Sequence, residues 1–328
     1  MLTLLRLGAL AALLGVGLSL PAHAAGLKNG SIAEQQLRHI ATYFPGRMAG
    51  SPAEMLTADY LQQRFTQLGY HSDPRRFNVR YAYRYQDGRQ AWRTVSATSV
   101  IAARAGSAPQ QIVIVAHSDS WIPRNDKEMQ QNLGGLSDQG VDDNASGLGV
   151  MLELAERLAT TPLHYSLRFV ALSGEEPGQQ GSEEYLSRMT PEEKHNTLLV
   201  INLDSLIIGH QLAFTSGSKT TKVVIQQTRD RAITLAHRYG ISAIKLNAAQ
   251  EQGPFDRAGF PLLGVTASDG PSGKAPRAVM AHFPPDLRHQ AQRDNLTYID
   301  RWLPGRITRR THDSVTVLLP LIRELANP

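Results

Sequence analysis

Acidic residues and a histidine follow three apolar runs of this sequence, and two further acids precede a helical pattern. The motifs are His117-Ser118-Asp119 after 112–116, Asp142-Asp143 before the helical pattern, Glu175-Glu176 after 167–172, and Asp204 at the end of 198–203. Near-continuous apolar runs are typical of buried central strands, whose carboxyl ends meet at one edge of a parallel sheet. Carboxylates gathered there repel one another unless a cation lies among them. Two divalent metal ions with a spare carboxylate would make a hydrolase.

Neighbouring residues in these motifs could divide the chemical work. Of the adjacent pair Glu175 and Glu176, one carboxylate can bind a metal ion while the other accepts a proton from an activated water. His117 and Asp119 project to the same side of extended chain, so that one can bind a metal while the other orients it. The spacing therefore predicts metal-assisted hydrolysis.

The segment 142–147, Asp-Asp-Asn-Ala-Ser-Gly, precedes an amphipathic pattern. One aspartate is enough to cap a helix, and two in a row repel unless a cation relieves them. Gly147 and Gly149 do not form a dinucleotide-binding motif, because Leu152 stands where a third glycine would be. H-E-x-x-H, G-x-S-x-G and P-loop signatures are absent from the sequence.

The first 24 residues have the pattern of an export signal. Arg6 precedes the apolar stretch 7–20, and the small residues Ala22 and Ala24 favour cleavage after Ala24. The stretch is short for a membrane span, so we expect no stable membrane anchor after cleavage. We expect residues 25–328 to form a single domain.

The composition narrows the compartment and the partners. Loss of Arg6 with the signal lowers the formal net charge from +5 to +4, and basic and acidic residues are interspersed, which does not indicate a nucleic-acid partner. Cysteine is absent, so any metal must be bound by histidine and carboxylate. Export without disulfides favours a bacterial periplasm, with secretion as the alternative.

Helical and strand patterns alternate along the chain, which predicts a three-layer α/β/α sandwich around a mixed, mostly parallel sheet. We expect helices at 32–43, 51–69, 145–158, 220–239 and 313–325, with a short helix from 190, and strands at 77–85, 92–104, 112–116, 167–172, 198–203, 212–215, 242–246 and 262–266.

Together, the motifs resemble the exported two-zinc aminopeptidases, relatives of bacterial leucyl aminopeptidase. Members carry His-x-Asp-Ser/Thr, Asp-Asp-Asn-Ala-Ser/Ala-Gly, Glu-Glu followed shortly by Gly-Ser or Gly-Ala, and a strand-end Leu-Asp. The matching residues here are 117–120, 142–147, Glu175-Glu176 with Gly181-Ser182, and Leu203-Asp204. Segments 44–52, 147–157, 198–204 and 303–310 extend the likeness over nearly all of residues 25–328.

The resemblance implies the zinc-exopeptidase fold, of the phosphorylase/hydrolase-like type, and two Zn²⁺ per chain. The implied roles are one zinc on His117 and Asp204, the other on Glu176 and a C-terminal histidine, a bridge by Asp143, Glu175 as general base, and Asp119 orienting His117. The implied reaction is hydrolysis of the first peptide bond of a polypeptide.

The last ligand requires a choice among three histidines. The family places it ahead of an aspartate and the closing helix, and His289 followed by Asp294 fits that order. His282 and His312 remain rivals: His282 lacks a following acid at suitable range, and His312 lies at an expected helix start. We predict His289.

Substrate preference is less constrained by the sequence. The resemblance implies peptide or protein N-termini as partners, a periplasmic alkaline phosphatase among them, with N-terminal Arg a candidate. An acidic pocket would then be needed, for which Glu251, Asp256 and Asp138 are nominees. The segment 250–254 departs from the family pattern, leaving specificity open, and 121–140 is loop-like and could form a rim or lid.

Two other functions remain open on the same scaffold. One is a glutaminyl-cyclase-like enzyme with a single zinc ion. The other is a binding protein that has lost catalysis, although every implied ligand position and the base are occupied here.

Overall fold

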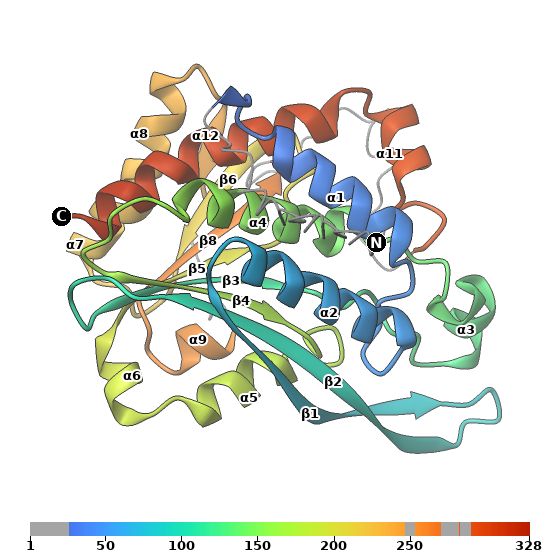
Figure 1. Ribbon diagram of the computed structural model, residues 1–328. Helices are drawn as coiled ribbons and strands as arrows, with labels where there is room; N and C mark the ends of the chain where they lie inside the picture. The colour runs from blue at the N-terminus through green and yellow to red at the C-terminus, as the bar shows by residue number, and fades with distance from the viewer. Residues whose placement is uncertain (1–25, 247–252, 270–281, 283–289) are drawn as a thin grey trace, which may run out of the picture.

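One mixed sheet of eight strands runs through the protein (Figure 1). The structure is a computed structural model that describes residues 26–246, 253–269, 282 and 290–328. The strand order is β1-β2-β4-β3-β5-β8-β6-β7. The pairs β4/β3, β3/β5 and β5/β8 are parallel, and the pairs β1/β2, β2/β4 and β6/β8 are antiparallel. The strands are β1 (His71–Arg84), β2 (Gln90–Arg104), β3 (Gln111–His117), β4 (Ser166–Leu172), β5 (Thr197–Leu203), β6 (Gln211–Ser216), β7 (Ala243–Lys245) and β8 (Leu262–Ser268).

Helices cover both faces of the sheet, which confirms the predicted three-layer sandwich (Figure 1). The larger core lies on the face covered by α1, α2, α4, α8 and α12, and a smaller one lies under α5 and α9. The described helices are α1 (Ser31–Tyr43), α2 (Pro52–Gln67), α3 (Asp126–Gln131), α4 (Ser146–Leu158), α5 (Gln180–Arg188), α6 (Pro191–Asn196), α7 (Lys222–Ile225), α8 (Arg231–Arg238), α9 (Pro254–Arg257), α11 (Leu296–Trp302) and α12 (Arg306–Ala326), with short turns at Leu133–Gly135, Val141–Ala145 and Gln226–Asp230.

The central strands are buried on both sides because their apolar runs alternate between the two cores. On β3, Ile112 and Ile114 join the larger core, whereas Val113 and Val115 join the smaller one. A strand placed between two layers of helices needs apolar side chains on both faces, which explains the near-continuous apolar runs in the sequence.

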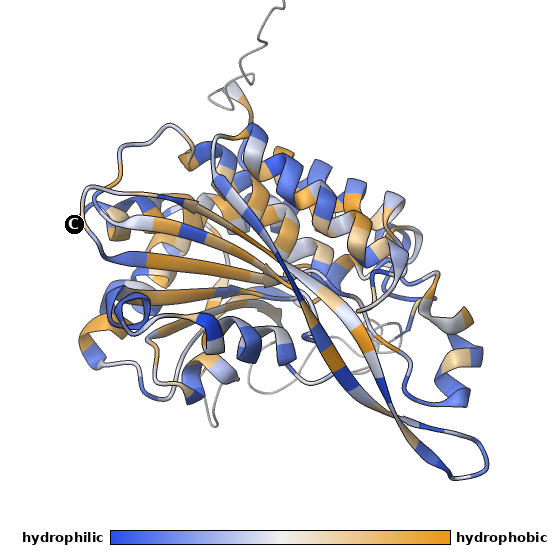
Figure 2. Ribbon diagram, turned by 60° about the horizontal axis from the view of Figure 1, so that its bottom comes forward, coloured by the Kyte–Doolittle hydropathy of each residue, from blue (hydrophilic) through white to orange (hydrophobic). Residues whose placement is uncertain are grey.

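The hairpin of β1 and β2 is longer than the sequence predicted and projects past the rest of the sheet (Figure 1). Polar and apolar residues alternate along it (Figure 2). Tyr81 and Tyr83 pack with Ile122 on the inner face, and Trp92 lies exposed on the outer face, where the Arg80 guanidinium lies 5.1 Å from the Trp92 ring centroid.

Two helix predictions were wrong because the apolar periodicity of the segment is weak. Helix α12 begins at Arg306, and the prediction started it near 313. Its first turns carry several arginines, which obscure the helical pattern although Ile307 is fully buried. Helix α5 was missed because it buries few apolar side chains, chiefly Tyr185 and Leu186. The helix predicted at 220–239 is confirmed, because α7, a π-helical turn and α8 follow one another without a break from Lys222 to Arg238.

In the part of the chain that the structure describes, no helix has both the length and the hydropathy to span a bilayer. The predicted signal at 1–24 lies outside the described residues, and the single-domain assignment stays a prediction.

Candidate metal centre

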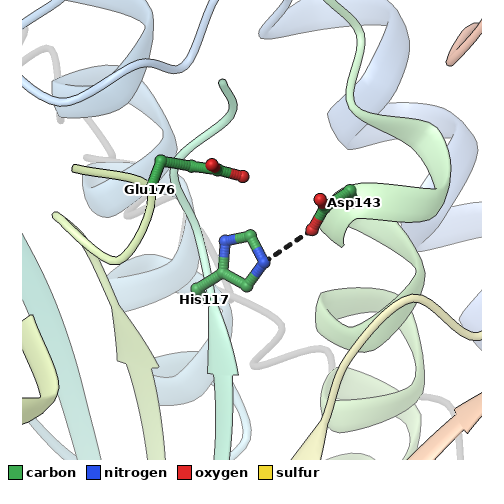
Figure 3. A group of neighbouring side chains, drawn as sticks. All are labelled: His117, Asp143 and Glu176. Carbon is green, nitrogen blue, oxygen red and sulfur yellow. Dashed lines mark hydrogen bonds and ion pairs between the residues drawn. The ribbon is translucent and has the colours of Figure 1, made fainter. Parts of the chain in front are cut away.

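Three adjacent strands bring the sequence motifs together. Strand β3 lies between β4 and β5, so His117 at its end is flanked by the residues that follow those two strands, Glu175-Glu176 and Asp204. His117 Nε2 lies 3.8 Å from Asp204 Oδ1 and 2.8 Å from Asp143 Oδ1. Figure 3 shows His117, Asp143 and Glu176 pointing toward a common space, and one ligand atom from each lies within 4.8 Å of the others.

The two adjacent aspartates point in different directions and do different work. The Asp143 carboxylate faces His117, whereas Asp142 is fully buried and its Oδ1 accepts the backbone N–H groups of Ile207 and Ile208 at 2.7 and 3.1 Å. Asp142 therefore fixes the loop after β5, and Asp143 is available to a cation.

Asn144 connects this turn to Asp204. Its Nδ2 donates to the carbonyl of Leu203 at 2.9 Å, and its Oδ1 accepts the N–H of Ser205 at 3.2 Å, so the residues on both sides of Asp204 are held. Asn144 Oδ1 also accepts the N–H of Gly147 at 3.0 Å, as a cap of α4 would. A Cβ at Gly147 would lie 2.5 Å from the Leu203 carbonyl oxygen, which explains the glycine in the motif.

Asp294 secures the same turn from the C-terminal side. Its fully buried carboxylate accepts the backbone N–H groups of Asp142 and Asp143 at 2.7 and 3.1 Å. Burial, together with the nearby carboxylates of Asp142 and Asp138, raises the pKa of Asp294 well above its usual value. The predicted ligand His289 lies outside the described residues. The aspartate that follows it, Asp294, contacts the metal centre by accepting backbone N–H groups of the turn.

Asp119 contacts both glutamates as well as His117, whereas the sequence predicted only that it orients His117. The Nδ1 atom of His117 is 3.0 Å from the backbone carbonyl oxygen of Asp119, while the Asp119 carboxylate lies 3.7 Å from Nδ1. That carboxylate, fully buried, accepts the backbone N–H groups of Glu175 and Glu176 at 3.2 and 3.1 Å. One residue thus links the end of β3 to both glutamates.

Glu175 is held by a hydrogen-bonding partner of its own. Ser182 donates to its carboxylate from both the backbone N–H and the hydroxyl, the latter at 3.0 Å. Burial and the charge of Asp119 raise the pKa of Glu175 to about 7, although the Ser182 bonds act in the opposite direction. A carboxylate with such a pKa can take up and release a proton near neutrality, as a general base must.

The remaining groups fit a bound cation. Burial and the charge of Asp143 raise the pKa of Glu176 well above its usual value. Burial alone would lower the pKa of His117, but the nearby carboxylates of Asp119, Asp143 and Asp204 raise it well above the ordinary histidine value. Both shifts favour protonation of a site whose imidazole and carboxylate groups are donors that zinc prefers.

Arg47 is a residue that the sequence did not single out. It is fully buried and donates to the backbone carbonyls of Ser118, Gln139 and Gly140 at 3.1, 2.7 and 3.1 Å. It ties the loop after β3 to the turn before Asp142. An arginine in a loop between helices gives no periodic signal, and only the segment likeness at 44–52 included it.

A cavity of about 200 Å³ opens beside the cluster. Its described walls are Val115, His117, Asp143, Leu172, Glu175, Glu176, Gln179, Ser182, Asn202, Asp204, Pro254, Phe255 and Leu262. The lining combines the metal donors and the candidate base with apolar side chains from the smaller core.

The rival histidines lie in other surroundings. The ring of His282 stacks on Trp302, with centroids 3.6 Å apart. His312 lies six residues inside α12 rather than at its start, and its side chain is 52% exposed. Neither belongs to the group that His117, Asp143 and Glu176 form among the described residues.

The segment 121–140 is more ordered than a loop. It contains α3 and the turn Leu133–Gly135, and the Arg124 guanidinium donates to the backbone carbonyl of Glu176. It therefore contacts the site, as a rim would, while a lid movement stays a prediction.

The sequence of this chain matches the family described as peptidase family M28 over residues 99–315. The alkaline phosphatase isozyme conversion protein of Escherichia coli is 50% identical over 99% of this chain and 99% of its own. A zinc aminopeptidase from Bacillus subtilis has a TM-score of 0.69 at 15% identity, and a glutaminyl cyclase from Fimbriiglobus ruber has 0.65 at 18%; each covers 90% of this chain and 95% of its own. At such identities the structures establish the fold alone.

Substitution of the two aspartates of the turn should have different effects on metal binding and on stability. Asp143→Ala should lose metal while retaining its melting temperature in excess chelator, because Asp143 contacts the cation site. Asp142→Ala should lower that melting temperature, since two buried N–H groups lose their acceptor at about 1–3 kcal/mol each. Metal content and thermal unfolding measure the two effects, and equal losses in both assays would contradict the division of roles.

Zinc affinity should rise with pH. The raised pKa values of His117 and Glu176 mean that protons compete with a metal ion for both groups, and this competition weakens as the pH rises. Competition with a chromophoric chelator at about pH 6 and about pH 8 measures the dependence. Equal affinities at the two values would show that these groups are not the ligands.

Proposed function

Because this chain belongs to peptidase family M28, we propose that it is an exported aminopeptidase that hydrolyses the N-terminal peptide bond of polypeptides with two zinc ions. The observation that carries the proposal is the pairing, in one cavity, of a metal-donor cluster with a separately held glutamate of raised pKa. His117 and Asp204 would hold one zinc, Glu176 and His289 the other, and Asp143 would contact both.

The chain's own residues account for the proton transfers. Bound zinc would lower the pKa of water and polarise a carbonyl group. Glu175, held by Ser182, accepts the proton of the attacking water at its carboxylate and passes it to the leaving amine.

Action at the chain end is favoured by a free amine. Asp143, Glu176 and Asp204 line the cavity together, and a free α-amine would bind beside the second zinc ion that these residues help to hold. An internal peptide segment has no such amine to offer. Peptide and protein N-termini are therefore the proposed substrates.

A basic first residue such as Arg is part of the proposal, but the acidic nominees do not support it equally. Asp256 is fully buried and accepts the N–H of Ser218 at 3.0 Å. Asp138 is also buried, and its carboxylate accepts the N–H of Gly140 at 3.0 Å. Neither lines the cavity, and Glu251 lies outside the described residues.

The relative from Escherichia coli suggests a natural target. Its name describes conversion of alkaline phosphatase isozymes, and it is 50% identical to this chain. We propose that the N-terminus of an alkaline phosphatase is a substrate of this protein. The proposal places this protein in the periplasm, after its own export and the cleavage of its signal following Ala24.

A single-zinc glutaminyl cyclase is the second candidate, favoured by the structural neighbour from Fimbriiglobus ruber. Such an enzyme would release ammonia from N-terminal glutamine rather than free amino acids. An inactive binding homologue is the third candidate and would release neither product.

Chelator treatment tests the proposal directly. A panel of aminoacyl-nitroanilides should be hydrolysed by the native protein, lose hydrolysis after metal removal and regain it with zinc, because water activation depends on the metal. Elemental analysis should find two zinc ions per chain. Activity that survives chelation, or a single zinc with ammonia release, would reject it.

Glu175→Gln should retain zinc but lose at least about 10²-fold in kcat, as removal of a general base typically does. The matched control is Glu183→Gln, since Glu183 is exposed and pairs with Arg257 away from the cluster. Kinetics and metal analysis of both variants decide the role, and normal turnover in the Glu175 variant would exclude it.

The last ligand can be identified by metal content. His289→Ala should reduce bound zinc from two ions to one, whereas His282→Ala should leave it unchanged, because the His282 ring stacks on Trp302. The opposite result would transfer the role to His282.

A further inference from the structure

The strands that carry the metal donors also form the cavity wall beneath them. Side chains two residues apart on a strand point to the same side, about 6–7 Å apart along it. Val115 therefore lies below His117, and Asn202 below Asp204, whose backbone N–H continues the strand pairing to Val265. The pairing places Val115 opposite Asn202.

Asn202 is a polar residue beside several apolar cavity residues. Val115, Leu172 and Leu262 belong to the smaller core, as does Phe255 from α9, and all four line the cavity with Asn202. Asn202 is partly exposed, and its side-chain amide has no hydrogen-bond partner among the described residues. An amide that faces an apolar pocket without a partner loses its water when a ligand covers it.

We propose that Asn202 selects the first residue of the substrate, favouring a side chain with an apolar stem and a neutral or cationic hydrogen-bonding end. This inference rests on the proposed function, in which the scissile bond lies at the metal donors and the first side chain extends into the cavity. Arg, Lys and Gln have this form.

The physical basis is a difference between covering the amide and pairing with it. An aliphatic end leaves the Asn202 amide dehydrated and unpaired, whereas a guanidinium, ammonium or amide end bonds to it. A carboxylate end could also bond to the amide, but the carboxylate of Glu175, which is not a proposed zinc ligand, lines the same cavity and repels it. Neutral and cationic ends remain.

The test compares substrates of equal length with and without a polar end. The native enzyme should hydrolyse Arg- and Lys-nitroanilide with a higher kcat/KM than norleucine-nitroanilide. Asn202→Leu should lower the Arg-to-norleucine ratio about tenfold or more, since the polar end loses its partner. Asn202→Asp should raise that ratio by adding a charge opposite the guanidinium, and it decides the question if the leucine variant does not fold.

Asn78→Leu is the matched control, because Asn78 is exposed on β1 and lies outside the cavity lining. Ratios in both Asn202 variants within twofold of the native value would overturn the assignment, while chelator-sensitive hydrolysis of any nitroanilide would leave the proposed aminopeptidase function standing. No hydrolysis by the native protein would instead reject the proposed function. The two failures are thus distinguishable.

Discussion

Mutual repulsion among carboxylates that follow β4 and β5 and lie in the turn before α4 is the constraint that organises this protein. Asp143, Glu176 and Asp204 meet around His117, and the pKa values of Glu176 and His117 are displaced in the direction that places protons among the acids. Each proton is a weak substitute for a divalent cation, because it neutralises one carboxylate where a metal ion can neutralise several. The electrostatics therefore favour metal uptake before any catalytic argument is made.

Such a cluster persists only if the backbone beneath it cannot relax. Asp142, Asn144 and Asp294 use their side chains to satisfy backbone groups of the segments that carry the ligands, and Asp119 does so for both glutamates. Arg47 adds bonds to four backbone carbonyls. A buried side chain that bonds to backbone fixes a position without competing for the metal, which explains why acids that are not proposed ligands surround the site.

Most of the metal-donor cluster could be predicted from the sequence because its histidine and acidic residues follow directly after the predicted strands. Apolar runs fixed β3, β4 and β5, and the adjacent-strand order then placed His117, Glu175-Glu176 and Asp204 together. Division of roles between Asp142 and Asp143 was not predictable, since neighbouring residues carry the same carboxylate and only the turn decides its direction. Arg47 was missed because its partners are carbonyls, which leave no trace in residue types.

The same geometry couples catalysis to selectivity. A strand that presents Asp204 at its end necessarily presents Asn202 one pleat deeper on the same side, and β3 does likewise with His117 and Val115. The distance between a metal donor and the wall that meets the substrate side chain is then set by backbone repeat rather than by loop conformation. Changes of residue type at these inner positions can alter preference while the donor positions stay fixed. A sandwich fold with ligands at strand ends thus separates the chemistry, in the outer row, from recognition, in the row beneath.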